Sequence, residues 1–260
     1  MCWKTVDVSF SLHPHQTHLD SENSFEMRRL LLTQREKGRF GEIVKLPKDV
    51  VIRDFTKGIK VRPLKEGEYD VGKFNERRMN MYETEHFKKT EKKVAGFDGM
   101  RNIHVGIDIG GPVNTPILSF ADGKILHFGY NPAKGDYGNV IVTEHEFLDD
   151  DENKSYKLYA LYGHLGASSI KGRKTGEFVS KGDRIGCMGA RDENGDWPPH
   201  VHFQLSVERP ETHDMPGVVS SSDHERAMKT FLDPRLVLGD LYKGQGSGPR
   251  GMWIDGDDDE

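Results

Sequence analysis

The stretch PHVHFQL at residues 199–205 places two histidines two positions apart inside an apolar run that is typical of a β-strand. On an extended strand, residues i and i+2 point to the same face, about 7 Å apart along the chain. His200 and His202 therefore face one small volume, in which one ring can bind a metal ion and the other can reach a water or substrate beside it. Upstream side chains offer the same chemistry and complete five candidates for one site: His104, Asp108 and His164.

The composition is that of a polar chain with room for a substantial core. Its 260 residues suffice for one large or two small domains without cross-links. No apolar run approaches the roughly 20 residues that a membrane span requires. The formal net charge is −5, and residues 255–260 carry five acids, so the remainder is close to neutral. We therefore expect no nucleic-acid-binding surface and no membrane anchor, and the sequence implies no obligate protein partner.

Cysteine usage and the first residues bear on the compartment. Cys2 and Cys187 are too few for a disulfide framework and form no Cys-x-x-Cys pair, so two reduced thiols are expected. Residues 1–7 lack the basic start and the apolar block of a signal peptide. The chain as given is predicted to be cytoplasmic, and a chain trimmed of its leader would be secreted.

Short β-rich runs separated by turns rich in glycine and aspartate fill the region from Ile103 to Val207. Closely spaced strands with such corners predict a mainly β fold, a compact antiparallel sheet in a sandwich or barrel-like arrangement. The expected strands are 103–109, 116–120, 123–130, 139–144, 156–161, 178–179, 184–188 and 201–207.

The rest of the chain predicts parts of different character. The predicted division is an N-terminal extension over 1–95, a β domain over 96–210, a C-terminal packing segment over 211–242 and a disordered acidic tail over 243–260. The extension is expected to be mixed α and β, with helices over 24–37 and 75–87 and one or two strands within 40–55. A short helix is expected over 224–231. The acidic run 149–152 predicts a hairpin tip, and the pair His13 and His15, which flanks a proline, predicts a loop.

His104 and Asp108 are separated by three residues, and their spacing makes a structural demand. On a straight strand the two side chains would lie roughly 13 Å apart, too far to share an ion that each ligand binds at about 2 Å. Either they do not share a metal, or the chain bends between them. Gly106 is the residue that permits such a bend. We predict a sharp turn or bulge at Gly106, with His104 leaving a loop and Asp108 opening the strand.

Imidazole and carboxylate groups suit zinc, and three such ligands leave a fourth position for water, the arrangement of a catalytic site. The helical metalloprotease signature is absent, because neither His145-Glu146 nor His224-Glu225 is followed by a second histidine at the required position. If the chain is a hydrolase, histidines must therefore handle the protons. His127 and His145 also lie in expected strands, and we interpret both as ordinary half-buried histidines.

Four motifs in fixed order carry a family resemblance. They are His-x-x-x-Asp, Tyr-x-His-Leu, Gly-Asp-x-Ile-Gly and His-x-His-Phe, spread between about Ile103 and Leu205. This pattern resembles the lysostaphin-like, or LytM-type, zinc endopeptidases with the duplicated hybrid motif fold. Some members carry a tyrosine just before the first histidine that supports the oxyanion. Residues 98–103 contain none, and Arg101 is the only cation there.

The resemblance implies a compact antiparallel sheet with a groove across it and one zinc ion per chain. It implies that the zinc ligands are His104, Asp108 and His202. His164 and His200 would orient and deprotonate the water, and which of the two is the base stays open. The implied function is that of a zinc-dependent metalloendopeptidase acting on peptide or peptidoglycan-like substrates. Tyr137 and Asn139 are expected to shape the groove floor, and residues 1–95 to lie across the groove as a regulatory segment.

Two other functions stay open at this point. The first is a peptide-binding module that keeps the fold without turnover, although degenerate relatives usually lose ligands and all five positions are present here. The second is a zinc hydrolase of a small cytosolic amide or ester. A groove open at both ends would favour a peptidase, and a closed pocket would favour the small molecule.

Overall fold

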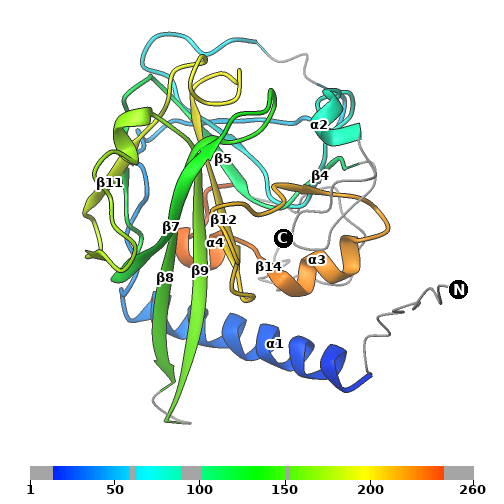
Figure 1. Ribbon diagram of the computed structural model, residues 1–260, viewed down its shortest axis with the longest axis vertical. Helices are drawn as coiled ribbons and strands as arrows, with labels where there is room; N and C mark the ends of the chain where they lie inside the picture. The colour runs from blue at the N-terminus through cyan, green and yellow to red at the C-terminus, as the bar shows by residue number, and fades with distance from the viewer. Residues whose placement is uncertain (1–13, 59–61, 89–100, 150–152, 243–260) are drawn as a thin grey trace, which may run out of the picture.

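The computed structural model describes residues 14–58, 62–88, 101–149 and 153–242. The predicted acidic tail, His13, Cys2 and most of the predicted hairpin tip lie outside these ranges. Within the described part, a large sheet and two small ones form the body, and few helices accompany them (Figure 1). The prediction of a mainly β fold is confirmed.

The large sheet has nine strands, eight of which follow the order β1-β2-β5-β12-β9-β8-β7-β10, with β14 paired to β12. Neighbouring strands are antiparallel except for the parallel pair β1 and β2. Their bounds are β1 Val51–Ile52, β2 Asp70–Gly72, β5 Ile107–Gly110, β7 Gly123–Asn131, β8 Gly138–Asp149, β9 Lys154–Leu165, β10 Phe178–Val179, β12 His200–Ser206 and β14 Phe231–Leu232.

Two small sheets and short helices complete the fold. One sheet pairs β6 Pro116–Leu118 with β11 Arg184–Cys187, and the other has the order β13-β4-β3, comprising Val218–Val219, Ile103–His104 and Glu76–Arg77. The helices are α1 Pro14–Glu36, α2 Glu85–Lys88, η1 Ala167–Ser169, α3 His224–Thr230 and α4 Arg235–Leu238. Helix α1 runs across one end of the body and packs against α3 and α4 (Figure 1).

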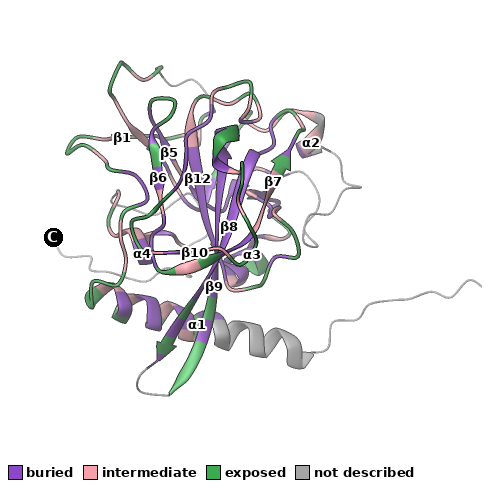
Figure 2. Cartoon of the chain, turned by 60° about the vertical axis from the view of Figure 1, so that its left-hand side comes forward, coloured by how far each residue is buried: buried purple, intermediate pink, exposed green. Residues whose placement is uncertain are grey.

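The core is continuous from the central strands to α1. Residues 201–206 of β12 are all buried, on both faces of the strand (Figure 2). Helix α1 adds Met27, Leu30 and Leu31 to the same apolar cluster. A strand that is buried on both faces usually has a near-continuous apolar sequence and not an alternating one. The polar side chains within β12 depart from this pattern. His202 and Gln204 are only 3% and 0% exposed, so burying them requires partners.

Several expected elements were wrong in the N-terminal part. The helix predicted over 75–87 is instead strand β3 followed by the four-residue α2, because Asn75 and Asn80 both adopt left-handed backbone angles, with φ of 53°, which an α-helix does not admit. Helix α1 begins ten residues before the predicted start at Ser24, and proline is well tolerated at a first helical position. His15 therefore lies on a helix and not in a loop.

The N-terminal part joins the sheets of the β region directly. Strand β2 pairs with β5, so that Gly72 lies opposite Asp108, and β3 pairs with β4, so that Glu76 lies opposite His104. These ladders join the N-terminal part to the strands that carry His104 and Asp108. The domain boundaries themselves stay a prediction.

The bend predicted at Gly106 is present. Strand β4 ends at His104 in the small sheet, the chain turns through Val105 and Gly106, and β5 begins at Ile107 in the large sheet. His104 thus leaves a short strand where a loop was expected. A methyl group on Gly106 would meet the His202 ring at 2.5 Å and the Phe203 carbonyl at 2.8 Å, so only glycine lets the bend between β4 and β5 pass this close to β12.

Replacing Gly106 with alanine is therefore expected to lower the free energy of unfolding by roughly 1–3 kcal/mol through overpacking. Urea denaturation of the metal-free protein measures this change. A midpoint equal to that of the wild type would contradict the close approach of Gly106 to the His202 ring.

Candidate active site

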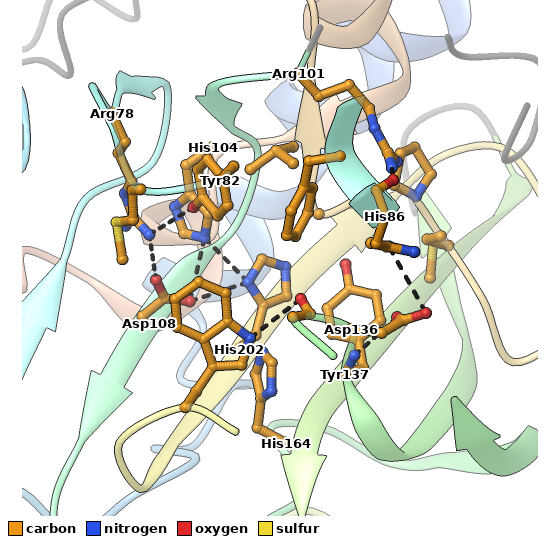
Figure 3. A pocket seen from close by; sticks show the side chains of 18 of the residues that line it. Arg78, Tyr82, His86, Arg101, His104, Asp108, Asp136, Tyr137, His164 and His202 are labelled. Atoms are coloured by element: carbon orange, nitrogen blue, oxygen red, sulfur yellow. Dashed lines mark hydrogen bonds and ion pairs between the residues drawn. The ribbon is translucent and has the colours of Figure 1, made fainter. Parts of the chain in front are cut away.

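Three donor atoms from separate parts of the chain converge at one end of the central strands. The distances are 3.1 Å from His104 Nε2 to Asp108 Oδ1, 3.0 Å from His104 Nε2 to His202 Nδ1, and 3.0 Å from His202 Nδ1 to Asp108 Oδ1. The register of β5 against β12 sets Asp108 directly opposite His202. The bend at Gly106 then returns His104 to the same point (Figure 3).

Hydrogen bonds on the far side of each ring fix which nitrogen carries the proton. His104 Nδ1 lies 2.8 Å from the Lys73 carbonyl oxygen, which can only accept, so Nδ1 is the donor and Nε2 keeps its lone pair. His202 Nε2 lies 3.0 Å from Gln204 Oε1, and the Gln204 amide nitrogen donates to the Pro216 carbonyl. His202 Nδ1 is therefore also a free lone pair.

Two imidazole lone pairs and a carboxylate oxygen thus point at one another. Without a cation this arrangement is repulsive. Protonating a ring would relieve it, but burial lowers the pKa of His104 to about 4, so that ring is neutral at neutral pH. Burial raises the pKa of Asp108, but the Arg78 guanidinium beside it helps to hold that pKa well below its usual range, so Asp108 stays ionised. The site is built to hold a positive charge that it does not itself supply.

The spacing of the three atoms suits zinc. Zinc bonds of about 2.0–2.1 Å in a tetrahedron separate neighbouring ligand atoms by about 3.3 Å. Two imidazole nitrogens and one carboxylate oxygen are a typical catalytic ligand set, and a tetrahedral ion held by three such atoms keeps one open position. The three donors could hold zinc with small movements.

His164 and His200 lie beside this trio. Their ring centroids are 4.1 Å apart, and His200 Nε2 lies 4.0 Å from Asp108 Oδ1. His164 Nδ1 donates to the Asn194 carbonyl at 2.8 Å and His200 Nδ1 to the Pro198 carbonyl at 2.7 Å, which leaves both Nε2 atoms as acceptors. Burial lowers the pKa of both rings, with the neighbouring His200 adding to the lowering at His164. Both can therefore accept a proton at neutral pH.

His164 holds an uncommon backbone conformation. Its φ is 60°, in the left-handed region that few side chains other than glycine, asparagine and aspartate adopt. Its own N–H donates to the Tyr137 carbonyl, and its carbonyl accepts from the Gly189 N–H. Strained residues of this kind gather at functional sites when the surrounding structure holds them in place.

The five histidine and aspartate side chains line one pocket with a cavity of about 60 Å³. Tyr82, Phe87 and Trp197 form an aromatic wall, with Tyr82 4.9 Å from Phe87 and 6.1 Å from Trp197 between ring centroids. The Tyr137 ring lies close to the His202 ring, with 5.2 Å between the ring centroids (Figure 3). Part of the N-terminal extension therefore lines the pocket, while its regulatory role stays a prediction.

Residues 102–214 match the model of peptidase family M23. Peptidoglycan DD-endopeptidase ShyB of Vibrio cholerae is 32% identical over 104 residues, which are 40% of this chain and 20% of that protein. The L-Ala–D-Glu endopeptidase of Bacillus subtilis is 30% identical over 124 residues, which are 46% of this chain and 34% of that protein. Residues 102–214 are an M23 peptidase domain.

The chain matches only a part of each of these proteins. The chain spans between 15% and 34% of the length of the curated relatives it matches. Among solved structures, the catalytic domain of lysostaphin from Staphylococcus simulans is 22% identical, with a TM-score of 0.33, and the match covers 58% of this chain and 87% of that domain. M23 is a family of metallopeptidases, so the prediction of a peptide-bond hydrolase is confirmed at the level of the family.

Five pocket residues of the extension, among them Met81 and His86, escaped prediction from the sequence. Arg78, Tyr82 and Phe87 come from a segment expected to be a helix, and only their juxtaposition in the fold identifies them. Arg78 donates to Asp108 Oδ2 at 2.6 Å. Tyr137, expected on the groove floor, does line the pocket. Asn139, expected there as well, donates its side-chain N–H groups to the Leu165 and Glu193 carbonyls.

His127 and His145 do not join the M23 site. His127 Nε2 bonds to the Pro210 carbonyl, and His145 is buried beside Phe120, with Nδ1 at 2.9 Å from the Asp122 carbonyl and Nε2 at 2.7 Å from Thr143 Oγ1.

The helices in the described part of the chain include none with the length and apolar character that a membrane span requires.

His145 makes stability depend on pH. Burial lowers its pKa to about 4, against about 6.5 in an unfolded chain. As the pH falls, His145 takes up a proton in the unfolded state before it does so in the folded state, which lowers the free energy of unfolding. The stabilisation by neutral His145 is therefore complete above about pH 6.5, and up to roughly 3 kcal/mol of it is lost as the pH falls toward about 4. Urea unfolding of metal-free wild type and His145→Gln at both ends of this window measures the difference. Equal losses in the two proteins would contradict the assignment.

Proposed function

We propose that the chain is a zinc-dependent endopeptidase that cleaves peptide bonds of peptidoglycan-like substrates. The observation that carries the proposal is the convergence of three lone-pair donors, His104 Nε2, Asp108 Oδ1 and His202 Nδ1, beside two neutral histidines. The M23 match supports the reaction class, and the names of the relatives from Vibrio cholerae and Bacillus subtilis support the kind of substrate.

The residues divide into a metal-holding set and a proton-handling pair. His104, Asp108 and His202 would hold one zinc ion, which when bound supplies a Lewis acid that polarises the scissile carbonyl and acidifies water. His164 or His200 accepts a proton at Nε2 from the attacking water and returns it to the leaving amine nitrogen. The Asn194 and Pro198 carbonyls keep these two Nε2 atoms free of hydrogen.

The second candidate is a zinc hydrolase of a small amide, whose substrate would lie in the same pocket, between the five site side chains and the aromatic wall. No observation favours a binding module without turnover, since all five side chains are assembled. The cytoplasmic location stays a prediction.

The test compares purified protein loaded with one equivalent of zinc against protein stripped by a chelator. Both are assayed on cross-linked peptidoglycan, on a panel of short peptides with free and blocked ends, and on small amides. We expect zinc-dependent release of new amino groups from peptidoglycan or peptides. Hydrolysis confined to the small amides would select the second candidate, and no zinc-dependent hydrolysis of any substrate would overturn both.

A further inference from the structure

Arg78 is a buried cation next to the metal-holding set. Its side chain is 1% exposed and belongs to the largest fully buried side chains of the described residues. Its Nη1 atom donates to Asp108 Oδ2 at 2.6 Å and to the Tyr82 hydroxyl oxygen at 3.0 Å (Figure 3). Its Nε atom donates to Glu76 Oε2 at 3.1 Å. A buried guanidinium is costly unless such partners compensate it.

We propose that Arg78 is a positioning residue that restricts Asp108 to binding the metal through one oxygen. The inference rests on the proposed zinc site. The carboxylate is divided between two tasks, because Oδ2 accepts the short, charge-assisted bond from Arg78 while Oδ1 lies 3.0–3.1 Å from both imidazole nitrogens. A carboxylate that bound through both oxygens would occupy the position that the attacking water needs.

The backbone places Arg78 for this task from two sides. Strand β3 pairs with β4, and the Arg78 N–H donates to the Asn102 carbonyl at 2.8 Å, which ties Arg78 to the strand that ends at His104. On the other side, Gly72 of β2 lies opposite Asp108. A methyl group on Gly72 would meet Arg78 Nη2 at 2.7 Å, so glycine leaves the space in which the guanidinium reaches the carboxylate.

Glu76 compensates the charge of Arg78 away from the metal. It is 0% exposed, accepts from Arg78 Nε, and also accepts from the Phe55 N–H at 3.1 Å. The guanidinium is thus held between two carboxylates, of which only Asp108 faces the imidazoles. Replacing Glu76 together with Arg78 avoids leaving the buried Glu76 carboxylate without its guanidinium partner.

A purely electrostatic role for Arg78 predicts the opposite effect on metal affinity. A guanidinium near a divalent cation repels it, so removal of that charge alone would tighten zinc binding. Removal of a positioning partner of a ligand instead weakens metal binding, typically by about 10–100-fold. The sign of the change in zinc affinity separates the two roles.

The experiment measures zinc dissociation constants by competition with a chelator, without substrate, for wild type, Arg78→Met and the double variant Glu76→Gln/Arg78→Met. Arg77→Met is the matched control, because Arg77 is the adjacent exposed residue and donates to Ser221 Oγ. Cobalt substitution adds a second readout, since tetrahedral Co²⁺ absorbs visible light more strongly than Co²⁺ with more ligands. Circular dichroism checks folding, and the double variant decides if Arg78→Met does not fold.

We expect zinc to bind about 10–100-fold more weakly to the variants that lack Arg78, with weaker cobalt absorption, and both properties to be unchanged in Arg77→Met. Zinc affinity equal to or tighter than that of the wild type, with an unchanged cobalt spectrum, would overturn the role of Arg78 and leave the zinc site standing. Failure of the wild type itself to bind one zinc ion would instead overturn the proposed function.

Discussion

His202→Ala is expected to lose stoichiometric zinc and to lower peptide hydrolysis by at least about 10³-fold. A metal ion contributes several kcal/mol of transition-state stabilisation, and each 1.4 kcal/mol is about tenfold in rate. The substitution removes one of the three donors and also leaves Gln204 Oε1 without the ring N–H that it accepts. Elemental analysis and kcat/KM on the best substrate of the panel measure the two effects.

His127→Ala is the control for this substitution. His127 lies on β7, and its Nε2 bonds to the Pro210 carbonyl, away from the donor trio. The His127→Ala variant should retain one zinc ion per chain and most of the wild-type activity. Full zinc content in His202→Ala would show that the ion binds elsewhere in the chain.

His164→Asn is expected to lower kcat by about 10²–10⁴-fold, the usual contribution of a general acid–base group, while zinc content stays at one per chain. Asparagine is the suitable replacement because it tolerates the left-handed backbone that His164 holds at φ 60°. The loss then reflects the imidazole and not the strain of an unsuitable residue. Rate measurements at saturating substrate, paired with elemental analysis, separate the two properties.

The same substitution at His200 tests the second ring. His200 Nε2 lies 4.0 Å from Asp108 Oδ1, and the His200 Nδ1 donates to the Pro198 carbonyl as His164 Nδ1 does to the Asn194 carbonyl. Loss of turnover in both variants with zinc retained is the expected pattern. If His164→Asn kept more than about a tenth of wild-type kcat, His164 would not be a proton-transfer group.

Strand positions near the site followed from local pattern because the site lies on the most regular part of the fold. The i, i+2 spacing of His200 and His202 predicted that both side chains lie on one face of the strand. On a straight strand His104 and Asp108 would lie too far apart to share an ion, and this distance identified Gly106 as the bend. The grouping of His104, Asp108 and His202 came from resemblance in motif order. Their separation along the chain carries no local signal.

The pocket wall from the N-terminal part could not be predicted in the same way. Asn75 and Asn80 sit in left-handed conformations that interrupt an otherwise acceptable helical pattern. Asparagine only permits this conformation and does not require it. Arg78 is one of many charged residues in the stretch 62–95, and its burial depends on Glu76 and on Asp108, which lies thirty positions away. Such compensation is a tertiary property.

X-ray absorption at the zinc edge tests the central claim most directly, using wild-type protein loaded with one equivalent of zinc. The account predicts a first shell of about four nitrogen or oxygen atoms at about 2.0–2.1 Å, with the outer-shell scattering of two imidazole rings. That scattering should fall to one ring in His202→Ala reconstituted with excess zinc. A sulfur atom at about 2.3 Å, or a shell without imidazole, would place the ion outside the His104, Asp108 and His202 trio and contradict the account.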